Sequence, residues 1–242
     1  MRRASCSWPL ALALASVVLL LAACGEAEVE TRDVVGVIPW ADGEEAHYRL
    51  EDRDGGERGR GTLRVDREGD RFRLSLRYSD DSNSDESAVL VDASTLKPFS
   101  VRREIHSEDT DTVVEAEYTG DQVRIRATSD SGVEQTFLDI PDHSYDNESS
   151  LFLWRTMPLA ADYSASYNAV ITNFRQNSVV TVRVSAPETV EVPAGVFEAW
   201  RVDVASGGTR QVAWYSADDR RLLVKYDSSR LVFLLEQAPP RG

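Results

Sequence analysis

Cysteine is nearly absent from this sequence: among 242 residues only Cys6 and Cys24 carry a thiol, and both lie near the N-terminus. The chain beyond residue 24 therefore has no thiol for a disulfide, a thiolate metal site or a cysteine nucleophile. Folding of that part of the chain must depend on its packed core alone.

Histidine is also scarce, and the sequence has no motif that builds an active site around one. His47, His106 and His143 are far apart, and no His-x-x-x-His spacing or cysteine pair supplies the further ligands that a metal needs. No Gly-x-Ser-x-Gly elbow occurs. Acidic pairs are too abundant for any one of them to identify a glycosidase. We therefore expect no metal, no cofactor, no catalytic residues and no enzymatic activity.

Only one long apolar run is present, over residues 9–23. It follows Arg2 and Arg3, has the length of a signal-peptide core, and is short for a membrane span. It ends in Leu21-Ala22-Ala23-Cys24, which resembles the lipobox of bacterial lipoproteins. The sequence thus predicts a signal peptide over 1–23, removed on export, and a lipidated Cys24. The alternative is an ordinary secretory signal with a chance cysteine.

A lipidated Cys24 predicts where the protein works. Several acyl chains such as palmitate on one residue suffice for stable membrane anchoring, whereas one chain does not. Gly25 follows Cys24, where lipoproteins retained in the inner membrane commonly have aspartate. We expect a lipid-anchored protein of the cell envelope. It would lie on the periplasmic side of the outer membrane in a diderm host, and otherwise on the outer face of the plasma membrane.

Positive charge is limited. Lysine occurs only at Lys97 and Lys225, and the formal net charge of −14 becomes −16 once Arg2 and Arg3 leave with the signal peptide. Such an acidic surface repels nucleic acids and anionic headgroups, so no nucleic-acid partner is expected. The expected partners are the membrane, reached through Cys24, a lipid or acyl ligand, and an envelope protein.

Alternation of apolar and polar residues dominates the remaining sequence. It is clearest at 71–78, 123–127, 180–184 and 200–204, and it is typical of half-buried antiparallel strands. Gly69 and Gly120 lie in short Gly-Asp turns between such runs. The pattern predicts a mainly β fold, a curled antiparallel sheet of roughly a dozen strands that forms a half-barrel or open barrel.

One segment departs from this alternation and predicts a covering helix near 147–157. Asp146 or Asn147 can cap its start, and Pro158 ends it. No linker-like stretch interrupts 36–237, which we therefore expect to be a single domain. Residues 24–35 would be the lipidated N-terminus and tether, and 238–242 a C-terminal tail.

The acidic segment 80–86 has the spacing of calcium ligands at Asp81, Asn83 and Asp85, with Asp92 at the twelfth position. However, Glu86 stands where a calcium loop needs glycine, and no helices flank it. The two interpretations are a calcium site and a solvated acidic hairpin tip, and the second is favoured.

The C-terminal part resembles a known family. The stretches 188–202 (ETVEVPAGVFEAWRV) and 214–226 (WYSADDRRLLVKY), together with 155–159 (RTMPL), resemble the domain-of-unknown-function 3108 family of bacterial envelope proteins over about residues 145–236. The resemblance implies a β half-barrel like the Lol-type lipoprotein carriers, which hold acyl chains between a curved sheet and helices. It implies no established activity.

The aromatic and apolar residues of this part have two interpretations: they line a lipid-sized cavity, or they fill the core. The candidate ligand-lining residues are Leu151, Phe152, Trp154, Met157, Trp200 and Trp214. We expect a non-enzymatic, membrane-anchored envelope lipoprotein that binds an acyl chain or other hydrophobic ligand between sheet and helix. The alternative is a structural or assembly protein of the envelope that acts through protein–protein contacts.

Overall fold

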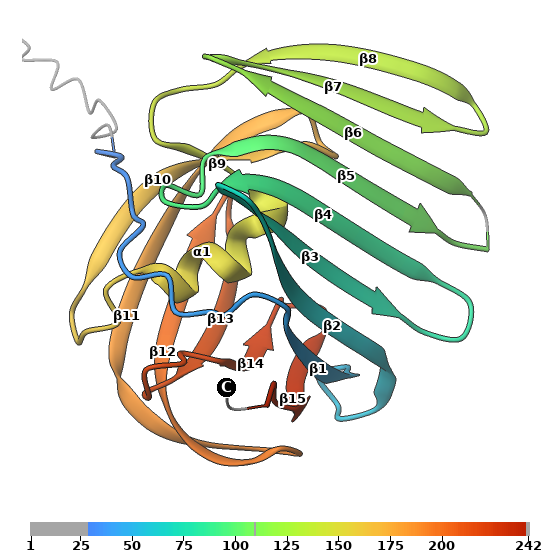
Figure 1. The fold of residues 1–242 in the computed structure, drawn as a ribbon. Helices are drawn as coiled ribbons and strands as arrows, with labels where there is room; N and C mark the ends of the chain where they lie inside the picture. Colours follow the sequence, from blue (N-terminus) through green and yellow to red (C-terminus); the bar gives the residue numbers. More distant parts are fainter. Residues whose placement is uncertain (1–28, 109, 241–242) are drawn as a thin grey trace, which may run out of the picture.

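The computed structural model describes residues 29–108 and 110–240, which form one large curled sheet with a short helix on its concave face (Figure 1). The strands are β1 (Glu44–Glu51), β2 (Glu57–Glu68), β3 (Arg71–Ser79), β4 (Ser84–Asp92), β5 (Pro98–His106), β6 (Asp111–Thr119), β7 (Gln122–Ser129), β8 (Gly132–Asp139), β9 (Ser144–Asp146), β10 (Ser164–Ile171), β11 (Gln176–Val192), β12 (Gly195–Ser206), β13 (Thr209–Ser216), β14 (Leu223–Asp227) and β15 (Val232–Gln237). The predicted signal peptide and Cys24 lie outside the described residues.

The sheet consists of two meanders joined along the first and last strands. Its order is β8-β7-β6-β5-β4-β3-β2-β1-β15-β14-β13-β12-β11-β10-β9. All neighbours are antiparallel except β9 and β10, which are parallel. The predicted fold, a curled, mainly β sheet with one helix, is confirmed. The strand count differs because β9 and β14, of three and five residues, are too short to show a clear alternation.

The predicted helical segment is a 3-10 turn, η1 (Asn147–Ser149), followed by α1 (Ser150–Thr156). The carboxylate of Asp146 accepts a hydrogen bond from the backbone N–H of Glu148, which caps the first turn as expected. Every residue of α1 is buried. The Tyr215 hydroxyl donates to the carbonyl of Leu151 at 2.7 Å, which fixes the helix on the concave face.

The two turns that the sequence places at glycines form as expected. Gly69 and Gly120 have φ angles of 66° and 61°, which a side chain would strain. Inward residues of the strands, among them Leu74, Val89 and Ile125, are almost completely buried. No helix in the described part of the chain is long and apolar enough to cross a membrane.

The segment before β1 packs along the sheet. The backbone N–H of Arg32 donates to the carbonyl of Ser166 on β10, and Val34 is buried. The N–H groups of Gly36 and Val37 both donate to the carbonyl of Thr156 at the end of α1. The described part of the predicted tether, 29–35, therefore contacts the domain and brings the N-terminal side of the chain to β10.

Candidate functional site

The candidate ligand-lining residues Leu151, Phe152 and Trp154 of α1, and Met157 directly after it, have two environments. Leu151 and Trp154 line an open cavity at the N-terminal end of the helix. Phe152 packs edge-on against Trp40, with ring centroids 6.2 Å apart, and Met157 is fully buried. Only the first pair can reach a ligand without rearrangement of the core.

The two candidate tryptophans on the strands lie elsewhere. Trp200 of β12 is half-buried and packs against the core. Trp214 of β13 lies under two cations, Arg201 and Lys225, at 5.4 and 5.0 Å from its ring, and its Nε1–H donates to Glu188. Its neighbour Tyr215 points inward to α1. The structure thus separates Trp214 from the helix and its cavity.

The space directly beneath the helix is filled. Between α1 and the strands β1, β2 and β14 there remains a void of about 10 Å³, bordered by Tyr48, Val65, Leu151 and Phe152. This is no more than the room that one water molecule needs. The core interpretation of the apolar residues therefore holds for the middle of the curl.

The open space lies at the N-terminal end of the helix, where two adjoining cavities form one groove. Each has a volume of about 450 Å³, and both are lined by Tyr78, Arg230 and Leu231. Small-molecule sites typically measure about 300–1,000 Å³. One wall is aromatic: the ring of Trp154 contacts that of Tyr226, which contacts Phe233.

A buried charged cluster closes the inner end of this groove. Arg103 of β5 donates to Asp85 of β4 through Nε at 2.9 Å and Nη2 at 2.6 Å, and to Glu148 of η1 through Nη1 at 2.9 Å. Tyr78 donates to the same Asp85 carboxylate at 2.5 Å. The Arg103 side chain is only 14% exposed. One guanidinium thus joins two carboxylates that curling of the sheet brings together with the helix cap.

A third carboxylate, Asp146, continues the cluster into the core. It is fully buried, accepts a hydrogen bond from Tyr118 of β6 at 2.5 Å, and lies beside Glu148. Burial and the neighbouring Glu148 carboxylate raise the pKa of Asp146 to about 7. Burial also raises the pKa of Glu148. The buried Asp146 carboxyl group behind the groove can therefore bind or release a proton near neutral pH.

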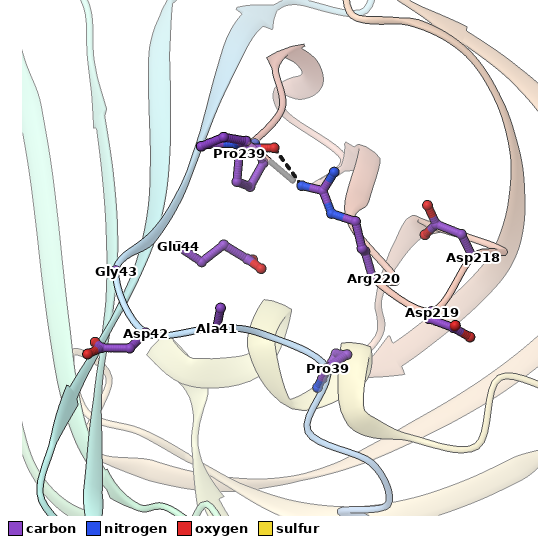
Figure 2. A pocket seen from close by; sticks show the side chains of 10 residues that line it. Pro39, Ala41, Asp42, Gly43, Glu44, Asp218, Asp219, Arg220 and Pro239 are labelled. Atoms are coloured by element: carbon purple, nitrogen blue, oxygen red, sulfur yellow. Dashed lines mark hydrogen bonds between the residues drawn. The ribbon is translucent and has the colours of Figure 1, made fainter. Parts of the chain in front are cut away.

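A further cavity opens at the opposite end of the helix (Figure 2). It measures about 640 Å³, and its acidic lining residues are Asp42, Glu44, Asp218 and Asp219. Arg220 crosses it and donates to the carbonyl of Pro239 at 2.7 Å. Glu44 is already paired with the buried Arg155 at 2.5 Å. Its apolar lining residues are Pro39, Ala41, Pro239 and Pro240, without an aromatic ring such as Trp154 or Phe233. We therefore take the groove, which has this aromatic wall, as the candidate ligand site.

The histidines are each engaged in local contacts. His47 lies 3.2 Å from Glu45, His106 lies 3.0 Å from Asp111, and His143 lies 3.4 Å from Asp33. Within residues 29–108 and 110–240, no group of three or more histidine, cysteine or acidic side chains is arranged to hold a metal ion.

The acidic segment 80–86 forms the tip of the β3–β4 hairpin, but its carboxylates do not converge. Backbone N–H groups of Ser82 and Asn83 donate to Asp80 and lower its pKa. Asp92 accepts from Ser94 and Thr95, which lowers its pKa to about 2. Asp85 points inward to Arg103 rather than to solvent. The segment is thus an acidic hairpin tip, the interpretation that the sequence favours, but Asp85 is buried in the core and not solvated.

The charged residues of the site, among them Asp85 and Arg103, were not identified from the sequence. Asp85 precedes the inward positions Ser87, Val89 and Val91 at steps of two, so continuing the alternation would have placed it inside. The sequence also contains a Ser-x-x-Lys spacing, at Ser94 and Lys97, which in some acyl-transfer enzymes supplies a nucleophile. The hydroxyl of Ser94 donates to Asp92, and Lys97 contacts Asp33 at 2.5 Å, so the two side chains do not act together.

Comparison with known proteins identifies the family. Residues 45–232 match the profile of the family described as "Protein of unknown function (DUF3108)", so this chain belongs to that family. The match extends beyond the resemblance at about residues 145–236 and includes strands β1 to β8. No curated protein matches the chain.

A solved structure shares the fold, and two others align with lower scores. A β-barrel-like protein of the domain of unknown function DUF1849 from Brucella abortus aligns with a TM-score of 0.55 at 12% identity, over 82% of this chain and 97% of that one. A candidate exported protein with a YmcC-like fold from Bacteroides fragilis aligns with a TM-score of 0.29 at 12% identity, over 85% and 100% of the two chains. A candidate lipoprotein from Parabacteroides distasonis aligns with a TM-score of 0.33 at 12% identity, over 85% and 99%.

Proposed function

We propose that this DUF3108 protein is a lipid-anchored envelope protein that binds an amphipathic ligand, such as a lipid or fatty acid, in the groove at the N-terminal end of α1. It would do so without catalysing a reaction. The lipobox-like sequence around Cys24 supports the anchoring, and the groove supports the binding.

The observation that carries the proposal is that the groove combines an aromatic, apolar wall with charged side chains. The ring of Trp154, the rings of Tyr226 and Phe233, and Leu231 provide a surface for a hydrocarbon chain. Burying each methylene there contributes about 0.8 kcal/mol. A polar headgroup could bind near the Arg103–Glu148 pair or near the exposed Arg230, which lines both cavities.

The experiment is a comparison of bound lipid in two variants of the membrane-anchored full chain. Leu231→Trp places an indole where the two cavities meet. Val196→Trp adds the same indole at an exposed position of β12, and it is the matched control. Solvent extraction of each purified protein followed by mass spectrometry separates a non-covalent ligand from the covalent anchor, which stays on the protein.

We expect the wild type and Val196→Trp to release a defined lipid, and Leu231→Trp to release at most a tenth as much. Binding of cis-parinaric acid, a fluorescent fatty acid, should rank the proteins in the same way: the wild type and Val196→Trp bind it with similar affinity, and Leu231→Trp binds it more weakly. Equal lipid content in all three proteins would refute binding in the groove. A mass showing unmodified Cys24 would refute the anchor independently of the ligand.

A further inference from the structure

The two edges of the open sheet differ in how well they are covered. All three residues of the β9 edge are buried, and Tyr118 and Lys97 contact them. Strand β8 forms the other edge, and among residues 29–108 and 110–240 no strand lies beyond it (Figure 1). Unpaired strand edges of this kind readily pair with another strand.

The hydrogen-bonding direction of β8 follows from its turn. Ser129 and Gly132 pair across the two-residue turn 130–131, so they exchange the first hydrogen bonds of the β7–β8 hairpin. Because bonded positions alternate, Glu134 and Thr136 also bond to β7, whereas Val133, Gln135 and Phe137 direct their backbone groups away from it.

An independent contact supports this assignment. The carbonyl of Asp139, which has the same parity as the outward residues, accepts a hydrogen bond from the side chain of Asn177 at 2.8 Å. In the part of the chain that the structure describes, no loop or turn forms a backbone hydrogen bond with Val133, Gln135 or Phe137.

The side chains of the same edge residues are exposed and apolar. Val133 is 56% exposed and Phe137 is 57% exposed, on the convex face beside Arg124 and Thr128 of β7. The inward side of β8 differs, because Glu134 pairs there with Arg175 at 2.5 Å. Strand β8 thus leaves both backbone groups and apolar side chains without partners.

We propose that β8 pairs antiparallel with β8 of a second copy of this chain, about a two-fold axis through Gln135. In this register Val133 of each copy lies opposite Phe137 of the other, and Gln135 lies opposite itself. All three outward positions then form hydrogen-bonded pairs. An aromatic side chain meets a β-branched one on both sides of the axis, a favourable cross-strand combination.

The charges of β8 tolerate this register. Glu134 of one copy lies opposite Thr136 of the other, so no two carboxylates oppose each other directly, and Arg175 of the same copy already pairs with Glu134. Asp139, whose carbonyl already accepts from Asn177, lies opposite Ser131 and outside the paired segment Val133–Phe137. A two-fold interface uses the same patch on both copies, and this patch is complementary to itself.

Cysteine substitutions test the register in the membrane-bound full chain. Gln135→Cys places two thiols on the axis, where the Cα atoms of a bonded pair are about 5.5 Å apart, within the range of a disulfide. Val133→Cys is the control, because its two copies are four residues apart along the strands, about 13 Å. Non-reducing gels of oxidised membranes would show a covalent dimer for Gln135→Cys. The wild type, whose only native cysteines are Cys6 of the predicted signal peptide and the predicted lipidation site Cys24, gives the background.

Proline tests the hydrogen bonds. Gln135→Pro removes the outward N–H that the second copy would need, and an edge strand tolerates proline there. Gln135→Ala keeps that N–H. Light scattering of the detergent-solubilised full chain should show dimers for the wild type and Gln135→Ala, and at least a tenfold weaker dimer for Gln135→Pro.

Three outcomes would overturn the proposal. These are equal cross-linking at positions 133 and 135, dimers that survive Gln135→Pro, and a wild-type monomer whose position 135 cross-links to a different protein. The last would assign β8 to an unrelated strand. None of these results depends on whether the groove binds a lipid.

Discussion

The buried carboxyl group of Asp146 makes a sharp prediction about pH and stability. Its pKa is raised from the usual 3.8 to about 7, because burial and the Glu148 carboxylate disfavour its charged form. Between these two values the folded state binds more protons than the unfolded state. The free energy of unfolding should therefore fall as the pH rises from about 4 to about 7.

The size of the effect follows from the shift. While the folded state binds one proton more than the unfolded state, each unit of pH increase lowers the free energy of unfolding by up to about 1.4 kcal/mol. Over the whole range between the two pKa values of Asp146, the loss amounts to about 4 kcal/mol. The raised pKa of Glu148 acts in the same direction. The lowered pKa values of Asp80 and Asp92 act oppositely, but only below about pH 4. From pH 5 to pH 7 we expect a loss of about 2–3 kcal/mol.

Urea unfolding at pH 5 and pH 7, followed by tryptophan fluorescence, measures this difference directly. Asp146→Asn keeps a cap for the helix and cannot ionise, so most of the difference should disappear. The Asn amide has one oxygen, whereas the Asp146 carboxylate accepts from Tyr118 and from the Glu148 N–H on separate oxygens. The lost hydrogen bond costs about 1 kcal/mol at both pH values. It therefore does not alter the stability difference between pH 5 and pH 7. Asp81→Asn, at the exposed hairpin tip, controls for loss of one charge. A wild type equally stable at both pH values, or an Asp146→Asn variant as pH-sensitive as the wild type, would refute the reasoning.

Two further substitutions test the packing around the groove. Arg103→Met leaves Asp85 and Glu148 without their shared cation, so we expect a loss of about 3–5 kcal/mol in urea unfolding at neutral pH, and less at acidic pH, where Glu148 can be protonated. A loss that does not depend on pH would contradict this. Leu153→Ala removes a fully buried side chain from α1 and should cost about 2–5 kcal/mol in the same assay, whereas a loss below about 1 kcal/mol would contradict a solid core beneath the helix.

The strands and the helix could be predicted because their signals are local. Alternation at 71–78 corresponds to β3, and the cap at Asp146 begins the helical segment. Trp214 shows the limit of this reasoning. Period two predicts that Trp214 and Tyr215 face opposite sides, but their order within the strand does not say which of them faces the core. That depends on pairing with β12 and β14, including a bulge at this point.

The polar cluster could not be predicted because it is non-local. Asp85 and Arg103 are on adjacent strands, which a meander predicts, but Glu148 reaches them only because the sheet curls around η1. The curvature depends on the twist accumulated over many strands and on pairing of β1 with β15, the most distant strands in the sequence. No short motif encodes either quantity.

The lengths of the elements explain why the molecule has open space at all. Helix α1 has 7 residues and is therefore about 10 Å long. Strands β3, β4 and β5 have 9 residues each and extend about 30 Å. A helix this short can fill only the middle of the curl. A cavity remains beyond each of its ends, and each end has a buried ion pair, Arg103 with Glu148 and Arg155 with Glu44. Water or a ligand can enter the open space at such ends, so charged side chains are tolerated there as long as they are paired.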